Sequence, residues 1–461
     1  MFKEKKNFSI INNSIYFKKK ILSFLDKIKK NSLIFLLCDN STTNIILYKE
    51  LIKKNTTLCL IDSKVDNKNL KKLINKFDPN YILLPENKKI NYDNFAKFKA
   101  YNIVKTKNKI LLKSNKIKIL LTTSGTFSSN KFVALTKKNI IENTQSISKY
   151  LKPNKKSVFV NNLPLHYSFG FSIINLAIFK GSKLLCTDYS ILNPNFWHLL
   201  RKYEVSYFSG VPYTFQILKK IKFFKFIGSK IKNICIAGGA IDIKTLEYLF
   251  ENSKKNGISL FNMYGQTEAS PRMSYHLIKK KDKNFLSIGK PISGGNFKII
   301  DNQGRVVTKN NEIGEIIYSG KNVMLGYVND RKEIDKLSGT KKFNKFLYTG
   351  DLGFFNDEHH YFITGRKKRI IKIFGVRLNL DEIEKVLNVF VTKSAIIEKD
   401  SKLYLILEEK KVNEKKIRLQ LKNKFKINPN YIKFIKIKKI PLNKNNKVDY
   451  IKLKKNVRDA Y

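Results

Sequence analysis

The 461-residue chain has little arginine, few acidic residues and only four cysteines. No apolar run approaches the roughly 18 residues that a membrane-spanning helix needs, so we expect no membrane span. The start, MFKEKKNFSI, lacks the apolar stretch of a signal peptide, and SLIFLLC at 32–38 is too short and too far from the start. It is more typical of a buried strand. These absences predict a cytoplasmic protein.

The four cysteines, Cys38, Cys59, Cys186 and Cys235, all lie inside apolar stretches. Their spacing matches no metal-binding pattern. Because free cysteine behaves as a small apolar residue in reducing compartments, we expect buried thiols here and neither disulfides nor a metal site.

The positive charge is large, with 91 Lys and Arg against 36 Asp and Glu and a net charge of +55. Such a charge suggests nucleic acid or an acidic membrane surface as a binding partner. The lysines are spread over the whole chain, however, and accompany heavy use of Asn and Ile, which AT-rich codons produce. No basic segment interleaved with aromatic residues stands out. We therefore expect no specific nucleic-acid partner, although this charge can steer an acidic protein partner.

The length exceeds the usual single-domain limit of roughly 250–300 residues. Residues 33–104 alternate short apolar runs with Lys-rich amphipathic stretches, which predicts an α/β domain with parallel strands covered by helices. Beyond about residue 285 the turns become closer and predict a β-rich subdomain. A strand-helix-strand pattern then predicts a small α+β domain. We place the boundary at Arg366, giving an N-terminal domain of residues 1–365 and a C-terminal domain of residues 366–461.

Residues 348–384 combine several features that suit a nucleotide. Asp351 lies in YTGD, which predicts a short turn whose carboxylate accepts hydrogen bonds from a vicinal diol such as a ribose. Gly365 predicts a break, and Arg366 supplies a cation for a phosphate or sugar oxygen. Lys367, Lys368 and Arg369 are expected to form an exposed basic run. A short apolar strand and a helix start at Asp381–Glu384 follow. This order indicates a nucleotide held at a domain edge.

Four further motifs surround this segment. They are LLTTSGTFSSNKF at 120–132, NMYGQTEAS at 262–270, NEIGEIIYSGKNVMLGY at 311–327 and PLNKNNKVDY at 441–450. Gly-rich loops recur by chance, but five motifs in this order are specific. The chain resembles the adenylate-forming superfamily, which includes acyl-CoA synthetases, peptide-synthetase adenylation domains and luciferases.

The resemblance implies that ATP, with Mg²⁺, is bound mainly by the N-terminal domain. Backbone groups and hydroxyls of a phosphate loop would surround the phosphates, and the family's adenine and magnesium segment would follow. The implied nucleotide-binding residues are Thr123, Ser124, Gly125, Thr126, Lys131, Gly238, Gly239, Ala240, Asn262 and Tyr264. Thr267 would offer a hydroxyl to phosphate and Glu268 an oxygen ligand to Mg²⁺. Ser128, Asn130 and Phe132 replace two glycines and a proline of the family pattern, which can alter how the loop closes.

The C-terminal residues implied by the resemblance complete the site. Asp351 would accept hydrogen bonds from the ribose hydroxyls, and Arg366 would bind ribose or phosphate. The resemblance implies that the small α+β C-terminal domain is mobile, with Lys368 as the hinge. Gly375 and Arg377 match positions near the thiol tunnel. Lys447 matches the lysine that bridges the attacking carboxylate and the α-phosphate, with Asn446 where a glycine is usual.

The resemblance also implies the substrate class. His166, Tyr167 and Gly170 in LPLHYSFGF match the acyl pocket, although a satisfied core histidine is the alternative for His166. Amino-acid-activating relatives place an aspartate near this region, and none occurs here, which favours an acyl or aryl carboxylate. The implied function is an ATP-dependent, AMP-forming acid–thiol ligase with a small-molecule carboxylate as substrate and CoA or phosphopantetheine as thiol acceptor.

Three alternatives stay open at this point. An amino-acid-adenylating, carrier-loading enzyme is the first, although the aspartate expected near LPLHYSFGF is missing. A non-catalytic nucleotide-binding homologue would explain the altered phosphate loop, but it has no need for Lys447. A basic nucleic-acid-binding protein would bind DNA in a salt-dependent way and release no pyrophosphate.

Overall fold

The computed structural model divides into two compact units, which we describe separately. Unit 1 comprises Met1–Asn296 and Tyr318–Leu347, and unit 2 comprises Phe297–Ile317 and Tyr348–Tyr461. The structure describes residues 8–11, 25–26, 28–91, 94–122, 131–228, 230–340, 346–373, 376–399, 402–408, 412–425, 427–443 and 447–458. The predicted domain boundary at Arg366 stays a prediction.

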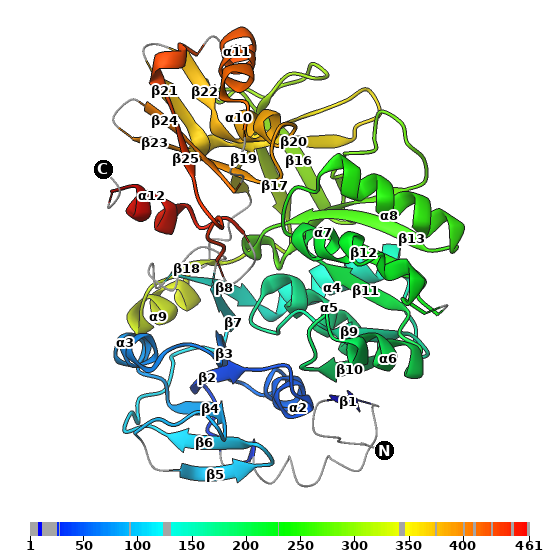
Figure 1. Cartoon of the computed structure of the whole chain (residues 1–461). Coiled ribbons are helices and arrows are strands. Elements are labelled where there is room, and N and C mark those ends of the chain that lie inside the picture. Colours follow the sequence, from blue (N-terminus) through cyan, green and yellow to red (C-terminus); the bar gives the residue numbers. More distant parts are fainter. Residues whose placement is uncertain are drawn as a thin grey trace. The chain divides into compact units, whose positions relative to one another are not determined.

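Unit 1 contains two large sheets, which can be followed in Figure 1. The first has the order β1-β10-β9-β11-β12-β13-β14-β15 and the second β18-β8-β7-β3-β2-β4-β6-β5. The first sheet is built from β1 (Phe8–Ile11), β9 (Val158–Asn161), β10 (Lys183–Thr187), β11 (Tyr207–Gly210), β12 (Asn233–Ile236), β13 (Ser259–Gly265), β14 (Arg272–Ile278) and β15 (Lys290–Pro291). The second is built from β2 (Leu33–Cys38), β3 (Thr57–Asp62), β4 (Tyr81–Pro85), β5 (Asn94–Phe98), β6 (Tyr101–Lys105), β7 (Ile117–Thr122), β8 (Phe132–Thr136) and β18 (Gly326–Val328).

The central strands of both sheets are parallel, as the sequence predicted, whereas strands toward the edges are antiparallel. The helices of unit 1 are α2 (Thr42–Leu51), α3 (Asn67–Phe77), α4 (Lys137–Leu151), α5 (Ser168–Lys180), α6 (Pro194–Lys202), α7 (Pro212–Lys220), α8 (Ile243–Lys255) and α9 (Arg331–Gly339), with the short 3₁₀ helices η2 (Phe223–Lys225) and η3 (Thr267–Ala269). Several helix starts are capped by short polar side chains, for example by Thr136 at α4 and Asp242 at α8.

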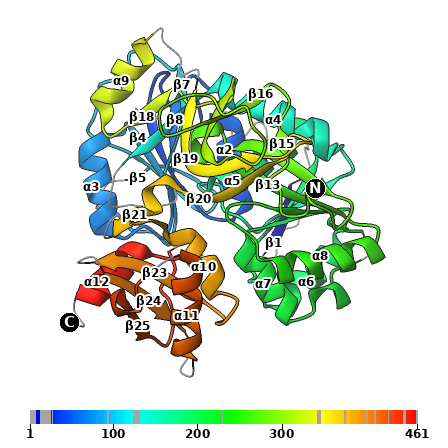
Figure 2. The same cartoon turned by 90° about the horizontal axis from the view of Figure 1, so that it is seen from above.

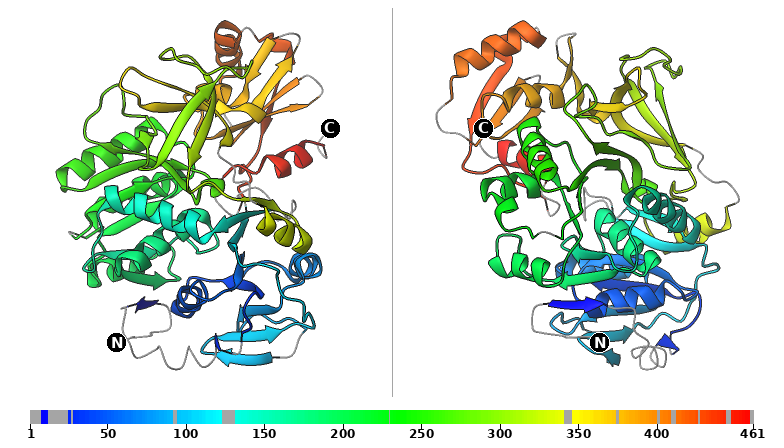
Figure 3. Two further views of the ribbon diagram at one scale, coloured as in Figure 1. Left: turned by 180° about the vertical axis from the view of Figure 1, so that it is seen from behind. Right: turned by 90° about the vertical axis from the view of Figure 1, so that its right-hand side faces the viewer.

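Side chains along each strand point alternately to the two faces of its sheet, so unit 1 has separate apolar cores on the two sides of each sheet. Leu184 and Leu36 point into a core shared by the two sheets and by α2, α4 and α5. Their neighbours point the other way, Leu185 toward α6, α7 and α8, and Leu37 toward α3 and α9. Figure 3 shows these layers of unit 1 from two further sides. The two faces of each sheet are therefore covered by helices, which confirms the α/β fold class.

Unit 2 is richer in short strands. One sheet, mainly in this unit, has the order β16-β17-β19-β20, β21 pairs with β22, and the third sheet has the order β23-β24-β25. The bounds are β16 (Gly295–Ile300), β17 (Gly314–Gly320), β19 (Leu347–Phe355), β20 (Tyr361–Arg366), β21 (Ile370–Ile373), β22 (Val376–Asn379), β23 (Ser394–Lys399), β24 (Lys402–Leu407) and β25 (Ile432–Lys436). The helices are η4 (Lys367–Arg369), α10 (Leu380–Leu387), α11 (Glu414–Phe425), η5 (Pro429–Tyr431) and α12 (Tyr450–Arg458).

The C-terminal sheet of unit 2 packs against its helices, and Figure 2 shows β23, β24 and β25 beside α10, α11 and α12. Ile383 on α10, Leu405 on β24 and Ile417 on α11 belong to one buried cluster. The predicted β-rich segment and the small α+β segment are thus both present. The four cysteines are all buried thiols, as predicted. Among the described helices, we find none with the length and hydropathy required to cross a bilayer.

Candidate functional site

The loop after β12 and the start of α5 meet in unit 1. Gly238 follows β12 and has φ +92°, a conformation that favours glycine. A Cβ atom at Gly238 would lie 2.6 Å from the Tyr167 hydroxyl oxygen, so the backbone of the Gly238-Gly239-Ala240 segment passes directly beside that phenol. The predicted adenine loop and the predicted acyl-pocket segment are therefore neighbours.

The HYSFG segment leads into the first turn of α5, with Tyr167 at the N-cap and Ser168 as the first helical residue. Gly170 lies in that turn, and a Cβ atom there would be 2.4 Å from the carbonyl oxygens of both Leu163 and Pro164. This glycine lets the helix pack closely against the preceding loop. Tyr167 is partly buried, and burial raises the pKa of its phenol to about 12. The assignment of His166, Tyr167 and Gly170 to an acyl pocket stays a prediction.

Strand β13 carries the predicted adenine segment. The side chain of Asn262 is buried, and its Nδ2 donates to the Ser287 carbonyl oxygen at 2.8 Å. Tyr264 and Thr267 are 9% and 8% exposed, and Thr267 begins η3. Because the carboxyl ends of β12 and β13 lie at one edge of a parallel region, this edge is where α/β sheets usually bind ligands.

Glu268, Tyr327 and Lys131 form a chain of contacts in unit 1. The Tyr327 hydroxyl donates to Glu268 Oε1 at 2.8 Å, and the Lys131 Nζ lies 3.4 Å from the centroid of the Tyr327 ring. Pairing of β18 with β8 sets this arrangement, since Tyr327 is opposite Val133. Burial, helped by the charge of Glu268, raises the pKa of Tyr327. The predicted magnesium carboxylate and the lysine after the phosphate loop are thus brought together.

Tyr327 was not identified from the sequence as a site residue. Its only signal is that it ends the NEIGEIIYSGKNVMLGY motif, which was predicted as a hairpin region without individual roles. Strand β18 pairs with β8, and this pairing places Tyr327 beside Lys131. The two strands are far apart in the sequence, so the motif alone does not reveal the contact.

Glu268 has the chemistry that a hard cation requires. In the part of the chain that the structure describes, no lysine or arginine forms an ion pair with its carboxylate, which accepts one phenol hydrogen bond. A carboxylate has about four lone-pair sites, so Glu268 retains capacity for a cation. Mg²⁺ is commonly bound by one or two carboxylates together with substrate phosphates, and the residue fits that role.

Several predicted site residues lie outside the described residues. Thr123, Ser124, Gly125 and Thr126 of the phosphate loop are among them, as is Gly375. Thr122 ends β7 and Phe132 begins β8, so the loop connects two neighbouring antiparallel strands. Lys368 lies in η4 and Arg377 lies in β22 opposite Lys372. Their roles stay predictions.

Asp351 and Arg366 are partners in unit 2. They are opposite each other on β19 and β20, and the Arg366 Nε lies 2.9 Å from Asp351 Oδ1. The Asp351 side chain is 3% exposed and that of Arg366 is 61% exposed. A buried carboxylate is thus paired with a cation that still reaches solvent.

Two local predictions about this segment were wrong. Asp351 lies inside β19 and not in a short turn, because the strand continues to Phe355 through a bulge after Leu352. Gly365 is not a break, since it pairs with Leu352 inside β20. The glycines in these motifs suggested turns, but the chain forms the β19–β20 ladder at these positions.

Lys447 lies in a closed loop of unit 2. Leu442 and Val448 form an isolated bridge, the Asn443 amide donates to the Lys447 carbonyl oxygen at 2.7 Å, and the Asp449 amide donates to the Pro441 carbonyl oxygen at 2.9 Å. Burial and, to a smaller extent, the positive charge of Arg366 lower the pKa of Lys447 to about 8, against the opposing effect of Asp351. The three C-terminal residues predicted to contact ATP and its carboxylate partner therefore act on one another electrostatically.

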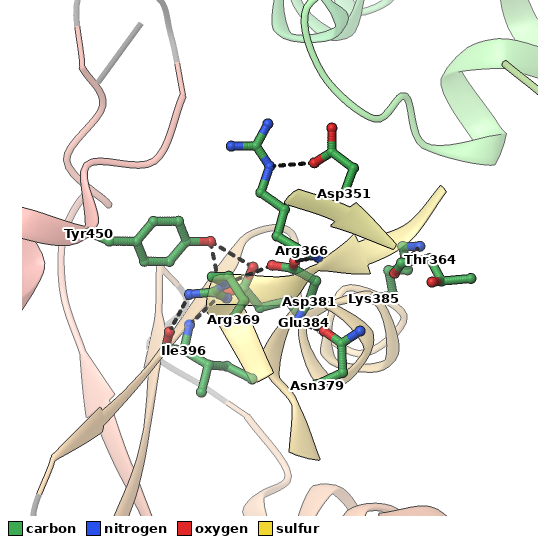
Figure 4. A network of polar contacts seen from close by, with 10 residues as sticks. All are labelled: Asp351, Thr364, Arg366, Arg369, Asn379, Asp381, Glu384, Lys385, Ile396 and Tyr450. Carbon is green, nitrogen blue, oxygen red and sulfur yellow. Dashed lines mark hydrogen bonds and ion pairs between the residues drawn. The ribbon is translucent and has the colours of Figure 1, made fainter. Parts of the chain in front are cut away.

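A partly buried polar network joins Tyr450, which directly follows this loop, to the rest of unit 2 (Figure 4). Arg369 lies at its centre, with Nε 2.7 Å from Asp381 Oδ1, Nη2 2.5 Å from Glu384 Oε1, and Nη1 donating to the Ile396 carbonyl oxygen at 3.0 Å. The Tyr450 hydroxyl donates to Glu384 Oε2 at 2.8 Å, and the Tyr450 ring lies 4.1 Å from the Arg369 guanidinium carbon. Four elements, η4, α10, β23 and α12, are joined in this way.

The network corrects the predicted exposed basic run. Lys367 is 58% exposed, as predicted, and pairs with Glu315. Arg369 is only 15% exposed and faces the carboxylates of α10. Burial alone would lower the pKa of Arg369, but the negative charges of Glu384 and Asp381 outweigh it and the pKa is raised. Arg369 and Tyr450 are polar residues of this region that the sequence did not identify.

A model of the AMP-binding enzyme family matches residues 25–328. Among curated proteins, the chain is 29% identical to oxalate–CoA ligase of Saccharomyces cerevisiae over 297 residues, which are 64% of this chain and 52% of that protein. It is 29% identical to a long-chain-fatty-acid–CoA ligase of Bacillus subtilis over 280 residues, 59% of this chain and 48% of that protein. The chain thus spans about half the length of these curated relatives.

Solved structures show the same fold. O-succinylbenzoate coenzyme A synthetase of Bacillus subtilis, in complex with AMP, has a TM-score of 0.73 at 21% identity and covers 94% of this chain and 90% of its own. ATP-bound MatB from Rhodopseudomonas palustris has a TM-score of 0.75 at 17% identity, with 96% and 92% covered. With the family model matching more than half of its length, the chain belongs to the AMP-binding enzyme family, within the adenylate-forming superfamily.

Proposed function

We propose that the chain is an ATP-dependent, AMP-forming acid–thiol ligase. It activates a small-molecule carboxylate as an acyl-adenylate and then transfers the acyl group to a thiol. Family membership supports the reaction class. The observation that carries the proposal is the grouping of Asp351, Arg366 and Lys447 in unit 2, because a protein that only bound nucleotide would need no lysine there.

In the first half-reaction, a carboxylate oxygen of the acid attacks the α-phosphorus of ATP and the bond to pyrophosphate breaks. In the second, a thiol attacks the acyl carbon and AMP leaves. Negative charge spreads over the phosphoryl oxygens during the first step, and a positioned ammonium group stabilises it. With a pKa of about 8, the Lys447 amine is mostly protonated at neutral pH and is suited to this role.

Asp351 and Arg366 are assigned to the nucleotide. The buried carboxylate of Asp351 is positioned by β19 and can accept hydrogen bonds from the two ribose hydroxyl groups. The guanidinium of Arg366 is held near it by the ion pair while remaining mostly exposed, so it can donate to a ribose or phosphate oxygen.

Residues of unit 1 are assigned to the remaining parts of ATP. Glu268 would hold Mg²⁺, which when bound neutralises phosphate charge. Lys131, packed on the Tyr327 ring, supplies a cation on the flank of the phosphate loop. Tyr264 offers a ring face to adenine beside the Gly238-Gly239 backbone, and Thr267 a hydroxyl to phosphate.

The acceptor is CoA or the phosphopantetheine of a carrier protein. Several curated relatives are named CoA ligases, which supports CoA. One solved neighbour is an adenylation–carrier protein pair complexed with phenylalanyl-adenylate, and the net charge of +55 would favour an acidic acyl-carrier protein. Lys368 as hinge and Gly375 and Arg377 near the thiol tunnel belong to this transfer step. We also propose a cytoplasmic location.

The test is ATP–pyrophosphate exchange by the purified chain across fatty, aryl, dicarboxylic and amino acids. We expect exchange with at least one non-amino acid. Lys447→Ala should lower exchange by roughly 10²–10³-fold, because one preorganised charge is removed from the transition state. The same variant should still form thioester from supplied acyl-AMP and CoA.

The outcomes separate the alternatives. Exchange only with amino acids would indicate a carrier-loading enzyme. Nucleotide binding without exchange for any acid would indicate a non-catalytic homologue. Equal loss of both half-reactions in Lys447→Ala, with the fold intact by circular dichroism, would contradict the role of Lys447.

A further inference from the structure

Arg272, the first residue of β14, is a buried arginine inside unit 1. It is 2% exposed. Its backbone is fixed by two asparagine side chains, since Asn143 Nδ2 and Asn322 Nδ2 donate to the Arg272 carbonyl oxygen at 2.8 and 3.0 Å. The position of this guanidinium is therefore set by several elements of the unit.

The guanidinium has more donors than partners. Nη1 donates to the Met263 sulfur at 2.8 Å, a weak acceptor, and Nη2 donates to Ser172 Oγ at 3.2 Å. The guanidinium carbon lies 4.1 Å from the centroid of the Phe169 ring. Nε is buried without a hydrogen-bond partner. Since an arginine carries five N–H donors, most of them are unused in this arrangement.

Among the described residues, no negative charge balances this cation. None of their ion pairs includes Arg272, and the titratable groups that act on its pKa are Tyr150, Cys235 and Tyr167. Burial raises the pKa of each of these three groups, so all are neutral at pH 7. Burial also lowers the pKa of Arg272. A buried charge without a counter-charge strongly destabilises a fold, so its presence calls for a ligand.

The guanidinium lines a small cavity. Its other polar walls are Ser172 on α5, Ser209 on β11 and Cys235 on β12, and apolar side chains of α4, α5 and β9 close the remainder. The free space is about 10 Å³, roughly the room that one water molecule takes up. A carboxylate has three heavy atoms and is larger than this space, so its binding requires the lining side chains to move apart.

The cavity lies next to the predicted nucleotide segment. Arg272 is opposite Gly265 in the β13–β14 ladder, directly after Tyr264. Tyr167, whose hydroxyl touches the Gly238 loop, is also close enough to Arg272 to affect its pKa. An acid that reacted beside this segment would need only a short chain to reach Arg272.

We propose that the substrate is a short acid with a second anionic group, most simply a second carboxylate, and that Arg272 binds this group inside the cavity. The inference rests on the proposed ligase function. A carboxylate would accept from Nε and Nη2 together, the bidentate geometry that arginine favours. It would supply both the missing acceptor and the missing negative charge.

The test compares matched acids in ATP–pyrophosphate exchange. The dicarboxylates succinate, glutarate and adipate are set against butanoate, pentanoate and hexanoate, which have the same lengths and one charge fewer. We expect the wild-type chain to prefer one dicarboxylate over its partner by at least about 10²-fold, because a site built to pair a polar group rejects analogues that lack it. Arg272→Met should remove at least about 10²-fold of the dicarboxylate exchange and leave or raise that of the monocarboxylate.

Two controls keep the result specific. Arg305→Met removes an exposed arginine, 75% accessible and paired with Asp301, and should leave both activities unchanged. Isothermal calorimetry of succinate, glutarate and adipate with the wild-type and Arg272→Met chains measures binding without turnover.

Exchange by the wild-type chain with monocarboxylates alone would overturn this inference and leave the ligase assignment standing. Absence of exchange with every acid would refute the ligase assignment. Calorimetry then decides on Arg272: dicarboxylate binding that Arg272→Met abolishes would support the anion site, and equal or absent binding in both chains would overturn it.

Discussion

Arg272 in unit 1 and Arg369 in unit 2 are both buried guanidinium groups, but their surroundings are opposite. Arg369 faces two carboxylates, Asp381 and Glu384, and a backbone carbonyl, and its pKa is raised by these charges. Arg272 faces a sulfur, a hydroxyl and an aromatic ring, and its pKa is lowered by burial. The first site is complete, and the second has unused donors beside a cavity.

The difference separates two uses of a buried cation. A guanidinium whose charge and donors are matched within the chain holds elements together, here η4, α10, β23 and α12. A guanidinium whose charge is unmatched destabilises the fold unless a ligand completes it. Buried cations without acids are therefore candidates for ligand recognition, whereas saturated networks are candidates for positioning.

The largest effect that sharpens this comparison is expected for Glu384→Ala. It leaves Arg369 buried with one carboxylate fewer and also removes the acceptor of Tyr450, so we expect a loss of about 3–5 kcal/mol in the stability of unit 2. Hydrogen exchange of peptides from α10 and β23 measures it, because local opening is read directly from amide protection.

The matched control is Glu382→Ala, on the same helix but outside the network. It should change amide protection in α10 and β23 little, since surface substitutions are usually within about 0.5 kcal/mol. Equal exchange rates in the wild-type and Glu384→Ala chains would show that the network does not stabilise unit 2.

Tyr450→Phe is expected to have a smaller effect. It removes one hydrogen bond to a carboxylate, typically about 1.5–3 kcal/mol, while keeping the ring against Arg369. Because Tyr450 follows the Lys447 loop by three residues, adenylate formation should fall while thioester formation from supplied acyl-AMP is kept. A uniform fall in both half-reactions would show that Tyr450 has no selective effect on the lysine loop.

The surroundings of Lys447 are intermediate between those of Arg272 and Arg369, because both the positive charge of Arg366 and the negative charge of Asp351 act on it. Its pKa is about 8 against an ordinary value of 10.5, so the unfolded chain binds more protons between these pH values. The destabilisation that Lys447 causes is therefore full below pH 8 and is relieved as the pH rises through this window. Activity has the opposite trend, because the charged form is the active one.

We therefore expect kcat/KM for adenylate formation to fall roughly tenfold per pH unit above about pH 8, as the protonated fraction of Lys447 falls. Measurement of pyrophosphate release from pH 6.5 to 10 tests this trend, with Lys447→Arg as the comparison because arginine stays charged over the whole range. A wild-type profile that stays flat to pH 10 would contradict the assignment.

The smallest effect is expected for the stability of Arg272→Met in the absence of ligand. Replacing an unpaired buried charge by an apolar side chain is often neutral or stabilising, so the change should be within about 1 kcal/mol or favourable. Urea unfolding followed by Trp197, the single tryptophan and a core residue of unit 1, measures it. A loss of stability similar to that expected for Glu384→Ala would contradict the proposed difference between Arg272 and Arg369.

The architecture could be predicted because strands and helices depend on residues that are close together in the sequence. Apolar runs such as 33–38 and 57–62 became parallel strands, and the motifs located Asp351, Arg366 and Lys447, which the fold brings into one unit. Strands and helices follow from residue spacing, which a single sequence displays directly.

The sequence could not predict contacts between segments far apart along the chain. Arg369 looked like part of an exposed basic run, but α10 covers it with two acids that lie 12 and 15 residues further on. Tyr327 reaches Glu268 through strand pairing, and Arg272 is buried by α4 and α5. Burial of a charge depends on tertiary packing, and no local pattern reports it.

The most direct test of the proposed reaction is the fate of oxygen in a reaction with ¹⁸O-labelled carboxylate, ATP and CoA. If the acid attacks the α-phosphorus and the thiol then attacks the acyl carbon, one labelled oxygen remains in AMP and none enters pyrophosphate. We expect that result with the acid that gives the fastest exchange. Label in inorganic phosphate together with ADP formation, or thioester formation without label in AMP, would contradict the account.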